Sequence, residues 1–112
     1  MVGPEQTIPP PGIERDRLIA KKLGLHIFDS GRVGVVPTGL SGLFGHVSTD
    51  PIAFTRLRLY MQKELGWDFA IYAAGAGDTA VMAFRVGANR MSRAQNKDEA
   101  DAGTRAILEA MG

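Results

Sequence analysis

The sequence contains no cysteine. This absence excludes disulfide bridges, catalytic thiols and zinc sites built on thiolates, and it is typical of a protein that works in a reducing cytosol. Histidine is almost as rare, because His26 and His46 are the only two, and they do not have the spacing of metal ligands. We therefore predict no metal site and no cofactor.

Long apolar runs and a strong net charge are also missing. No stretch approaches the roughly 18 consecutive apolar residues of a membrane helix, and the first residues lack the apolar core of a secretory signal. Thirteen Lys and Arg nearly balance 12 Asp and Glu, which leaves a formal net charge of +1 and no broad field to attract nucleic acid. We expect a cytoplasmic protein without a membrane partner, and nucleic acid is a disfavoured partner.

The residues that are present predict one small globular domain. The chain has 112 residues, of which 45% are hydrophobic, and this is enough for a modest core. Four of the six prolines fall within the first 11 residues, in "PEQTIPPPG". We therefore expect residues 1–11 to be a flexible lead-in and residues 12–112 to be a single α/β domain.

Three segments have the apolar spacing of helices. The first covers residues 13–23 and ends at Gly24. The second begins after Asp50, which is a good N-cap residue, with Pro51 at the first helical position, and it ends at Gly66. The third covers residues 98–111, with acidic residues near its positive N-terminal end.

Four short segments have the pattern of strands. "LHIF" and "RVGVVP" flank "DSG" as a first hairpin, and "WDFAIYA" and "TAVMAFRV" flank "AGAGD" as a second one, whereas "GANRMSRAQNK" is predicted to be a polar connection. Both faces of the second hairpin are apolar, one with large side chains and the other with Ala70, Tyr72, Val81 and Ala83. The predicted fold is a three-layer α/β/α sandwich with the order α-β-β-α-β-β-α and one antiparallel four-stranded sheet.

The glycine-rich stretch between Gly31 and Pro51 is the first candidate site. "GVVPTGLS" has the glycine spacing of a phosphate-binding P-loop, but Leu40 occupies the position of the required lysine. An alternative is a nest of backbone amides that binds a nucleotide or another small anion. Its candidate residues are Gly39, Gly42, Gly45 and Ser48. The carboxylate of Asp50 argues against an anion there.

A second interpretation of the same stretch is a loop that binds a protein. Its apolar side chains suit a contact surface, although they can also fold back over the edge of the sheet. The candidate contact residues are Leu43, Phe44, His46, Arg56 and Arg90. Neither a nucleophilic triad nor a pair of carboxylates with catalytic spacing is recognisable, so we predict that the protein is not an enzyme.

Three segments resemble the phage ABA sandwich domain family, a group of small phage and prophage proteins. They are "GIERDRLIAKKLGL", "VSTDPIAFTRLRLYMQKELGWDF" and "DEADAGTRAILEAM", and the resemblance runs from about Gly12 to Met111. The third segment has a glycine and lacks the usual cysteine of the family. The resemblance implies a mobile-element setting and no catalytic residues.

In that setting we expect an accessory protein that binds a host bacterial protein, for example an anti-CRISPR-like inhibitor of a bacterial defence system. Two alternatives stay open, namely a module that sequesters a small ligand or nucleotide and a weak nucleic-acid binder. A homodimer is a further option, because a hairpin edge such as Thr79 to Val86 can pair across a two-fold axis.

Overall fold

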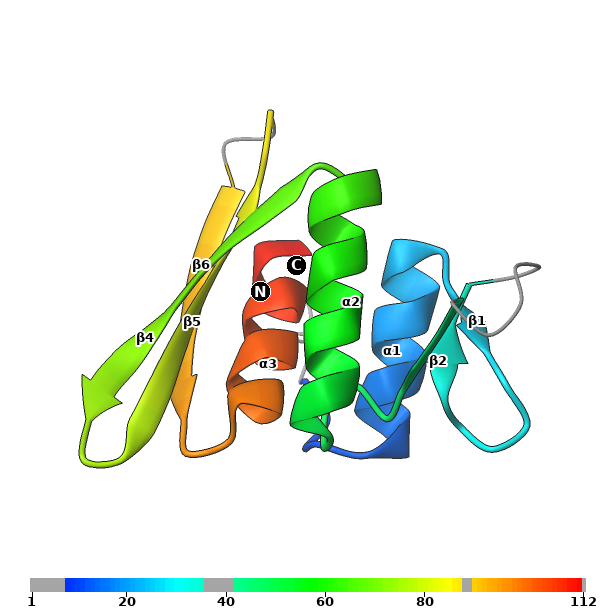
Figure 1. The fold of residues 1–112 in the computed structure, drawn as a ribbon, viewed down its shortest axis with the longest axis horizontal. Helices are drawn as coiled ribbons and strands as arrows, with labels where there is room; N and C mark the ends of the chain where they lie inside the picture. The colour runs from blue at the N-terminus through cyan, green and yellow to red at the C-terminus, as the bar shows by residue number, and fades with distance from the viewer. Residues whose placement is uncertain (1–7, 36–41, 88–89, 112) are drawn as a thin grey trace, which may run out of the picture.

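The computed structural model describes residues 8–35, 42–87 and 90–111. These residues form three helices and six strands (Figure 1). In chain order they are α1 (Ile13–Leu23), β1 (His26–Ile27), β2 (Val33–Gly34), β3 (Leu43–Gly45), α2 (Pro51–Glu64), β4 (Trp67–Gly75), β5 (Asp78–Arg85), β6 (Arg90–Asn96) and α3 (Glu99–Met111).

The strands form two antiparallel sheets of three strands, ordered β1-β2-β3 and β4-β5-β6, and the helices lie between these sheets (Figure 1). The mixed α/β class predicted from the sequence is confirmed. The single four-stranded sheet is wrong, because each predicted hairpin gains a third strand of its own instead of joining the other hairpin. The layer order is also reversed, since the helices are enclosed by sheets.

The helix predictions are confirmed because they depend on local signals. α1 ends at Gly24, whose φ of 72° is the left-handed conformation that favours glycine at this position. α2 begins as expected, since the Asp50 side chain accepts a hydrogen bond from the Ile52 N–H and Pro51 is the first helical residue.

The strand β6 was predicted to be a polar connection, and this prediction is wrong. Its sequence "RMSRAQN" contains one buried apolar residue, Ala94, because only one face of the strand meets the core and the neighbouring inward positions are the polar Ser92 and Asn96. Ser92 points inward and donates a short hydrogen bond to the carbonyl oxygen of Ala106 on α3. A strand that buries so little apolar surface has a weak sequence pattern.

The segment from Thr79 to Val86 was predicted to offer a hairpin edge, and this is also wrong. Its strand, β5, pairs with β4 on one side and with β6 on the other. The two edges of this sheet are therefore β4 and β6.

A bulge sets the register of the long hairpin. Gly75 pairs with Asp78 across the turn, but Ala73 pairs with Thr79, so Ala74 is left between these two pairs. A bulge of one residue reverses which side chains of the two strands share a face.

Because of this bulge, the large side chains of β4 share a face with the small side chains of β5. Phe69 lies opposite Ala83 on the side of the helices, whereas Met82 and Phe84 lie on the other side. The sequence-based assignment, which put the large residues of both strands on one face, is therefore wrong.

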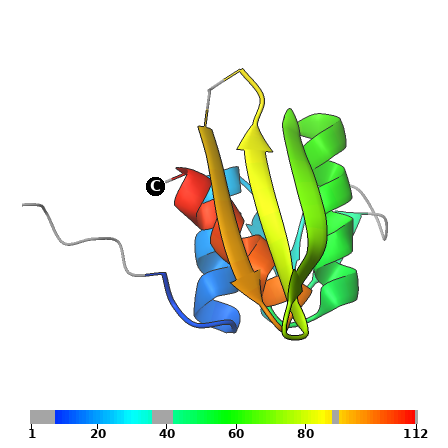
Figure 2. The same cartoon turned by 90° about the vertical axis from the view of Figure 1, so that its left-hand side faces the viewer.

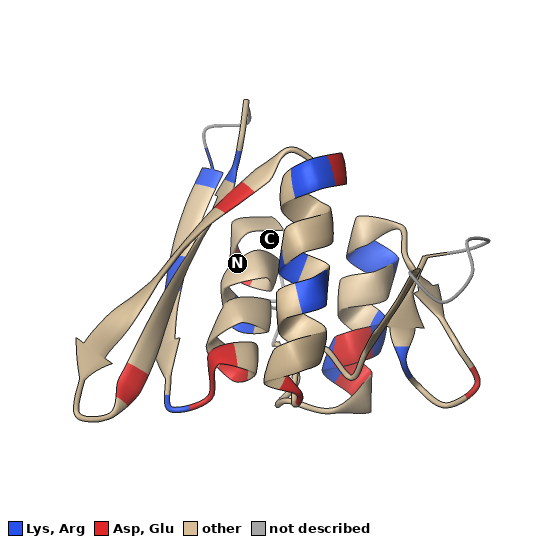
Figure 3. Cartoon of the chain, in the orientation of Figure 1, with Lys and Arg blue, Asp and Glu red and all other residues tan. Residues whose placement is uncertain are grey.

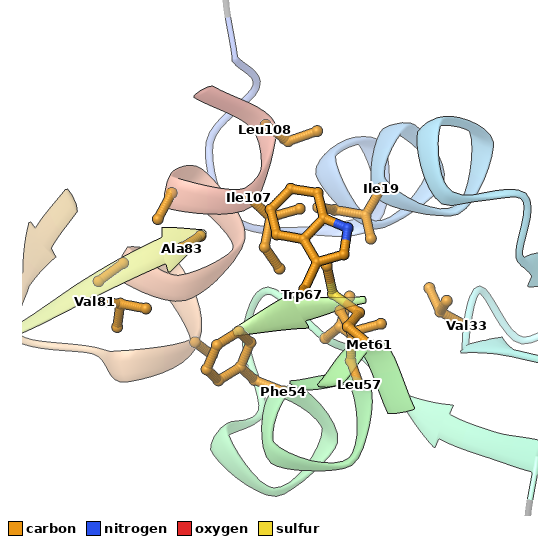
Figure 4. Packing of buried hydrophobic residues seen from close by; sticks show 14 of the residues in the cluster. Ile19, Val33, Phe54, Leu57, Met61, Trp67, Val81, Ala83, Ile107 and Leu108 are labelled. Carbon is orange, nitrogen blue, oxygen red and sulfur yellow. The ribbon is translucent and has the colours of Figure 1, made fainter. Parts of the chain in front are cut away.

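The core surrounds the helices and extends from the longer sheet to the small sheet, which contributes Val33 and Phe44 (Figure 4). The α2 side chains Phe54, Leu57 and Met61 are fully buried there. α3 is buried on most of its surface, and Gly103 lies so close to Phe54 that a Cβ atom there would overlap the Phe54 ring. Glycine at this position lets α2 and α3 approach each other closely.

Candidate functional site

The glycine-rich stretch is only partly described, because Gly39 lies outside the described residues. Gly42 is buried, and its carbonyl oxygen accepts a hydrogen bond of 2.6 Å from the Val35 N–H. Gly45 is the last residue of β3 and packs close to the Ala53 side chain. These two glycines belong to the small sheet and its contact with α2.

Phe44 does not lie on a surface in this structure. Its side chain is in the core, 5% exposed, and its ring lies 5.4 Å from the ring of Tyr60 on α2. Leu43 is half-buried beside it. Of the two interpretations, the one in which Leu43 and Phe44 fold back against the protein agrees with this burial.

The backbone N–H of Ser48 already binds a carboxyl group of the protein itself. The Ser48 N–H donates a hydrogen bond of 2.9 Å to Oδ1 of the buried Asp16 carboxylate on α1. The Ser48 hydroxyl donates to the Gly12 carbonyl oxygen and accepts from the Gly12 N–H. The polar groups that a ligand would need at Ser48 therefore connect the turn before α2 to the start of α1.

Burial raises the pKa of Asp16 above its ordinary value of 3.8, and the neighbouring polar groups of Ser48 oppose that rise. The second carboxylate oxygen, Oδ2, has no hydrogen-bond partner among the described residues. Nδ1 of the half-exposed His46 lies 3.9 Å from it. His46 therefore lies beside an internal carboxylate.

Arg15, the neighbour of Asp16, is also fully buried. Its guanidinium donates to the Pro9 carbonyl oxygen at 2.7 Å and forms an ion pair of 2.5 Å with Asp101 on α3. This cluster was not predicted from the sequence. The available signal was helical spacing, because Arg15 precedes the buried Ile19 by four residues and therefore lies on the same side of α1.

The other two predicted contact residues lie apart from the glycine-rich stretch. Arg56 is exposed on α2. Arg90 is exposed on β6, where its guanidinium donates to the Ala110 carbonyl oxygen near the end of α3. β6 and the small sheet lie on opposite sides of the helices (Figure 1). The five predicted contact residues therefore do not form one surface.

A different surface stands out, on the side of the longer sheet that faces away from the helices. Figure 2 shows its three strands in front of the helices, with no described helix or strand over them. We call this surface the outer sheet face and define it by the side chains that alternate with the core residues. They are Asp68, Ala70, Tyr72, Ala80, Met82, Phe84, Met91, Arg93 and Gln95.

Six of these nine side chains are alanine, methionine or aromatic. Tyr72 is 41% exposed and Met91 is 59% exposed, while Met82 and Phe84 are half-buried between them. Charged residues along β4 and β5 are few and lie near the strand ends (Figure 3). On β6, Arg93 lies opposite Met82 of the middle strand, so the outer sheet face is mainly apolar and carries one arginine near its centre.

A chain of hydrogen bonds crosses the outer sheet face. Arg93 on β6 donates through Nε to the Tyr72 hydroxyl on β4 at 2.6 Å, and its guanidinium lies 5.6 Å from the centre of the Tyr72 ring. Gln95 links Arg93 to Asp78. Ala80 on β5 lies between these strands and is fully covered. These bonds hold a tyrosine and an arginine in fixed positions beside apolar side chains.

Two kinds of site do not occur in the described part of the chain. Within residues 8–35, 42–87 and 90–111, no three histidine or carboxylate side chains gather where they could hold a metal ion. In the same ranges, no helix has both the length and the apolar character that a membrane crossing needs.

Comparison of the chain with models of known protein families finds no match. No curated protein and no solved structure matches it either. The resemblance to the phage ABA sandwich domain family therefore stays a prediction from the three sequence segments. The outer sheet face is the feature of the described residues that bears on function.

Proposed function

We propose that this chain is a non-enzymatic phage or prophage accessory protein that binds a host bacterial protein through the outer sheet face. The observation that carries the binding function is the mainly apolar surface of this face, which no described element covers. Contiguous apolar patches on a protein surface mark interaction sites. The phage setting and a defence protein as the target come from the sequence resemblance alone.

The composition of the outer sheet face supports a protein as the partner. Aromatic residues, methionine and arginine are enriched in protein interfaces, and they provide most of the binding energy there. Tyr72 and Arg93 are already held together by a hydrogen bond, so binding would cost less side-chain entropy than it would for free side chains.

Neither alternative function is favoured by a contact of the described residues. For a nucleotide, the Ser48 N–H and hydroxyl are already bonded to Asp16 and Gly12. For nucleic acid, the carboxylates of Asp68, at one end of the outer sheet face, and of Asp78, which binds Gln95 at the other end, repel phosphate. Both alternatives predict binding that does not depend on Met91.

The experiment is co-purification of host proteins from a bacterial lysate with the wild-type chain and two variants. Met91→Asp places a charge on the outer sheet face and should abolish retention of the partner. Ile52→Asp changes a residue on α2 that is 64% exposed and should leave retention unchanged. Retention that survives Met91→Asp, or no specific retention by the wild-type chain, would refute the proposal.

A further inference from the structure

The strand β4 has one paired edge and one free edge in the described part of the chain, because β5 is its only neighbour in the sheet. One hydrogen bond shows which backbone groups point to the free edge. The Val86 N–H donates to the Gly66 carbonyl oxygen at 3.0 Å, in the register that continues along the hairpin. Backbone groups alternate between the two edges of a strand, so even-numbered residues of β4 point toward β5.

The odd-numbered residues Phe69, Ile71 and Ala73 therefore direct their N–H and C=O groups toward the free edge. A second hydrogen bond agrees with this assignment, because the Phe69 N–H is bonded by its neighbouring side-chain oxygen, Oδ1 of Asp68, at 2.9 Å. The Asp68 side chain therefore already binds one of the N–H donors of the free edge, near the start of β4. Among the described residues, none pairs with the backbone groups of Ile71 and Ala73 on this edge.

The free edge of β4 lacks the devices that protect most edge strands, which are charged side chains and proline. Residues 69–74, "FAIYAA", contain no charged residue, no proline and no glycine. The opposite edge strand, β6, is protected, since it carries Arg90 and Arg93. The bulge of β4 comes only near its end, after Ala73. This edge is therefore the one that needs a partner strand.

We propose that a second copy of this chain covers the free edge, with β4 pairing antiparallel to β4 of the second copy across a two-fold axis. In this register, Ile71 of each copy faces Ala73 of the other. Each of these two pairs exchanges two backbone hydrogen bonds, which makes four in total, and the Phe69 N–H keeps its hydrogen bond to the Asp68 side chain. The two sheets then form one sheet of six strands, with the two outer sheet faces side by side.

The side chains of β4 are compatible with their own copies in this register. Tyr72 faces Tyr72 of the second copy on the outer sheet face, and aromatic cross-strand pairs stabilise sheets. Asp68 is the only charged residue of β4, and it lies beyond the paired residues, so no like charges meet. Pairing of β6 with its own copy around Arg93 would bring two guanidinium groups together. A net charge of +1 adds little repulsion between copies.

The oligomeric state tests the proposal first. Sedimentation velocity and light scattering of the wild-type chain over a range of concentrations should show a monomer and a dimer in equilibrium. Ile71→Lys places two like charges across the two-fold axis and should weaken the dimer at least about tenfold. The control Met91→Lys introduces the same charge at an exposed residue of β6 and should leave the dimer unchanged. A wild-type chain that is monomeric throughout overturns the proposal.

Amide hydrogen exchange gives a second test that does not depend on a variant. The amides of Ile71 and Ala73 should exchange at least about tenfold more slowly in the dimer than in the dilute monomer, because only a partner strand can bond them. The Val81 amide, on the central strand β5, should be protected in both forms and reports the integrity of the fold. Equal exchange of Ile71 and Ala73 in both forms would overturn the proposal.

This inference goes beyond the proposed function and can fail separately from it. A monomeric chain that still retains a host protein through Met91 leaves the proposed function intact. A dimer that retains no host protein removes the proposed function and keeps the β4 interface.

Discussion

Arg15 and Asp16 are adjacent residues on α1, and both are buried. Arg15 has a charged partner, Asp101, and a carbonyl partner, Pro9, so its charge is compensated within the protein. Asp16 has an uncharged donor, the Ser48 N–H, and its second oxygen has no hydrogen-bond partner among the described residues. The two residues therefore respond differently to substitution.

Replacement of Arg15 should strongly destabilise the fold. Arg15→Ala removes the ion pair and leaves Asp101 without its cation, and loss of one partner of a buried pair costs about 3–5 kcal/mol. Arg17→Ala changes an exposed residue of the same helix and should change stability by about 0.5 kcal/mol or less. Urea unfolding measures both, and equal losses would contradict the structural role of Arg15.

Asp16 should make stability depend on pH. Because the pKa of Asp16 is raised in the folded state, the stability that its protonated form contributes is fully present below pH 3.8. This stability is lost as the pH rises through the folded-state pKa. Asp16→Asn keeps an oxygen for the Ser48 N–H and does not ionise. The stability of the Asn variant relative to the wild type should therefore be higher at neutral pH than at acidic pH, as measured by urea unfolding at both. A difference that does not change with pH would contradict this prediction.

At the scale of elements, helix positions were predictable from the sequence and strand partners were not. The start of α2 follows from Asp50 and Pro51, which act within one turn. One bulged residue, Ala74, decides which side chains of β5 lie on the same face as the large side chains of β4. Its sequence context, "YAAGAG", does not distinguish a bulge from a regular turn. Which side chains lie on the outer sheet face follows from this register and could not be predicted before it.

The contact between α2 and α3 should not tolerate a side chain at Gly103. Gly103→Ala places a methyl group inside the Phe54 ring position and should cost about 1–3 kcal/mol in thermal or urea unfolding. In Phe54→Leu, the smaller side chain should accept the methyl group, so the double variant should lose less than the sum of the single variants. Additive losses would show that the two residues do not meet.

The turn of the long hairpin should become more stable with a better residue at Ala76. Ala76 and Gly77 both have positive φ values, 53° and 80°, and such turns favour Asn or Asp followed by Gly. Ala76→Asn should raise stability by about 1 kcal/mol, and Gly77→Ala should lower it by a similar amount. Thermal unfolding measures both changes, and a shift in the same direction for the two variants would contradict this turn geometry.

At the scale of the whole molecule, the helices lie between two sheets of unequal size, and the longer sheet has an outer face without a covering layer (Figure 2). Both faces of the long hairpin are apolar in the sequence, which predicts a helical layer on each. The structure has one such layer. The second apolar face is therefore available to another molecule, and this is the basis of the proposed function.

Association through β4 should make the thermal stability depend on protein concentration. A dimer that forms only from folded chains is stabilised by mass action, so the Tm should rise with concentration. Ile71→Lys should remove this dependence, and Met91→Lys should retain it. A wild-type Tm that is independent of concentration would contradict the dimer.

The sequence by itself determined the three helices, the two hairpins and the mixed α/β class, because capping residues, turns and apolar spacing act between near neighbours in the chain. Only the tertiary structure decided that the hairpins form separate sheets, that β6 completes the longer sheet, and that Arg15 and Asp16 are buried. These features depend on contacts between residues far apart in the chain. The glycine-rich stretch shows the difference, since its resemblance to an anion site is visible in the sequence, whereas the Asp16 carboxylate that Ser48 binds is visible only in the fold.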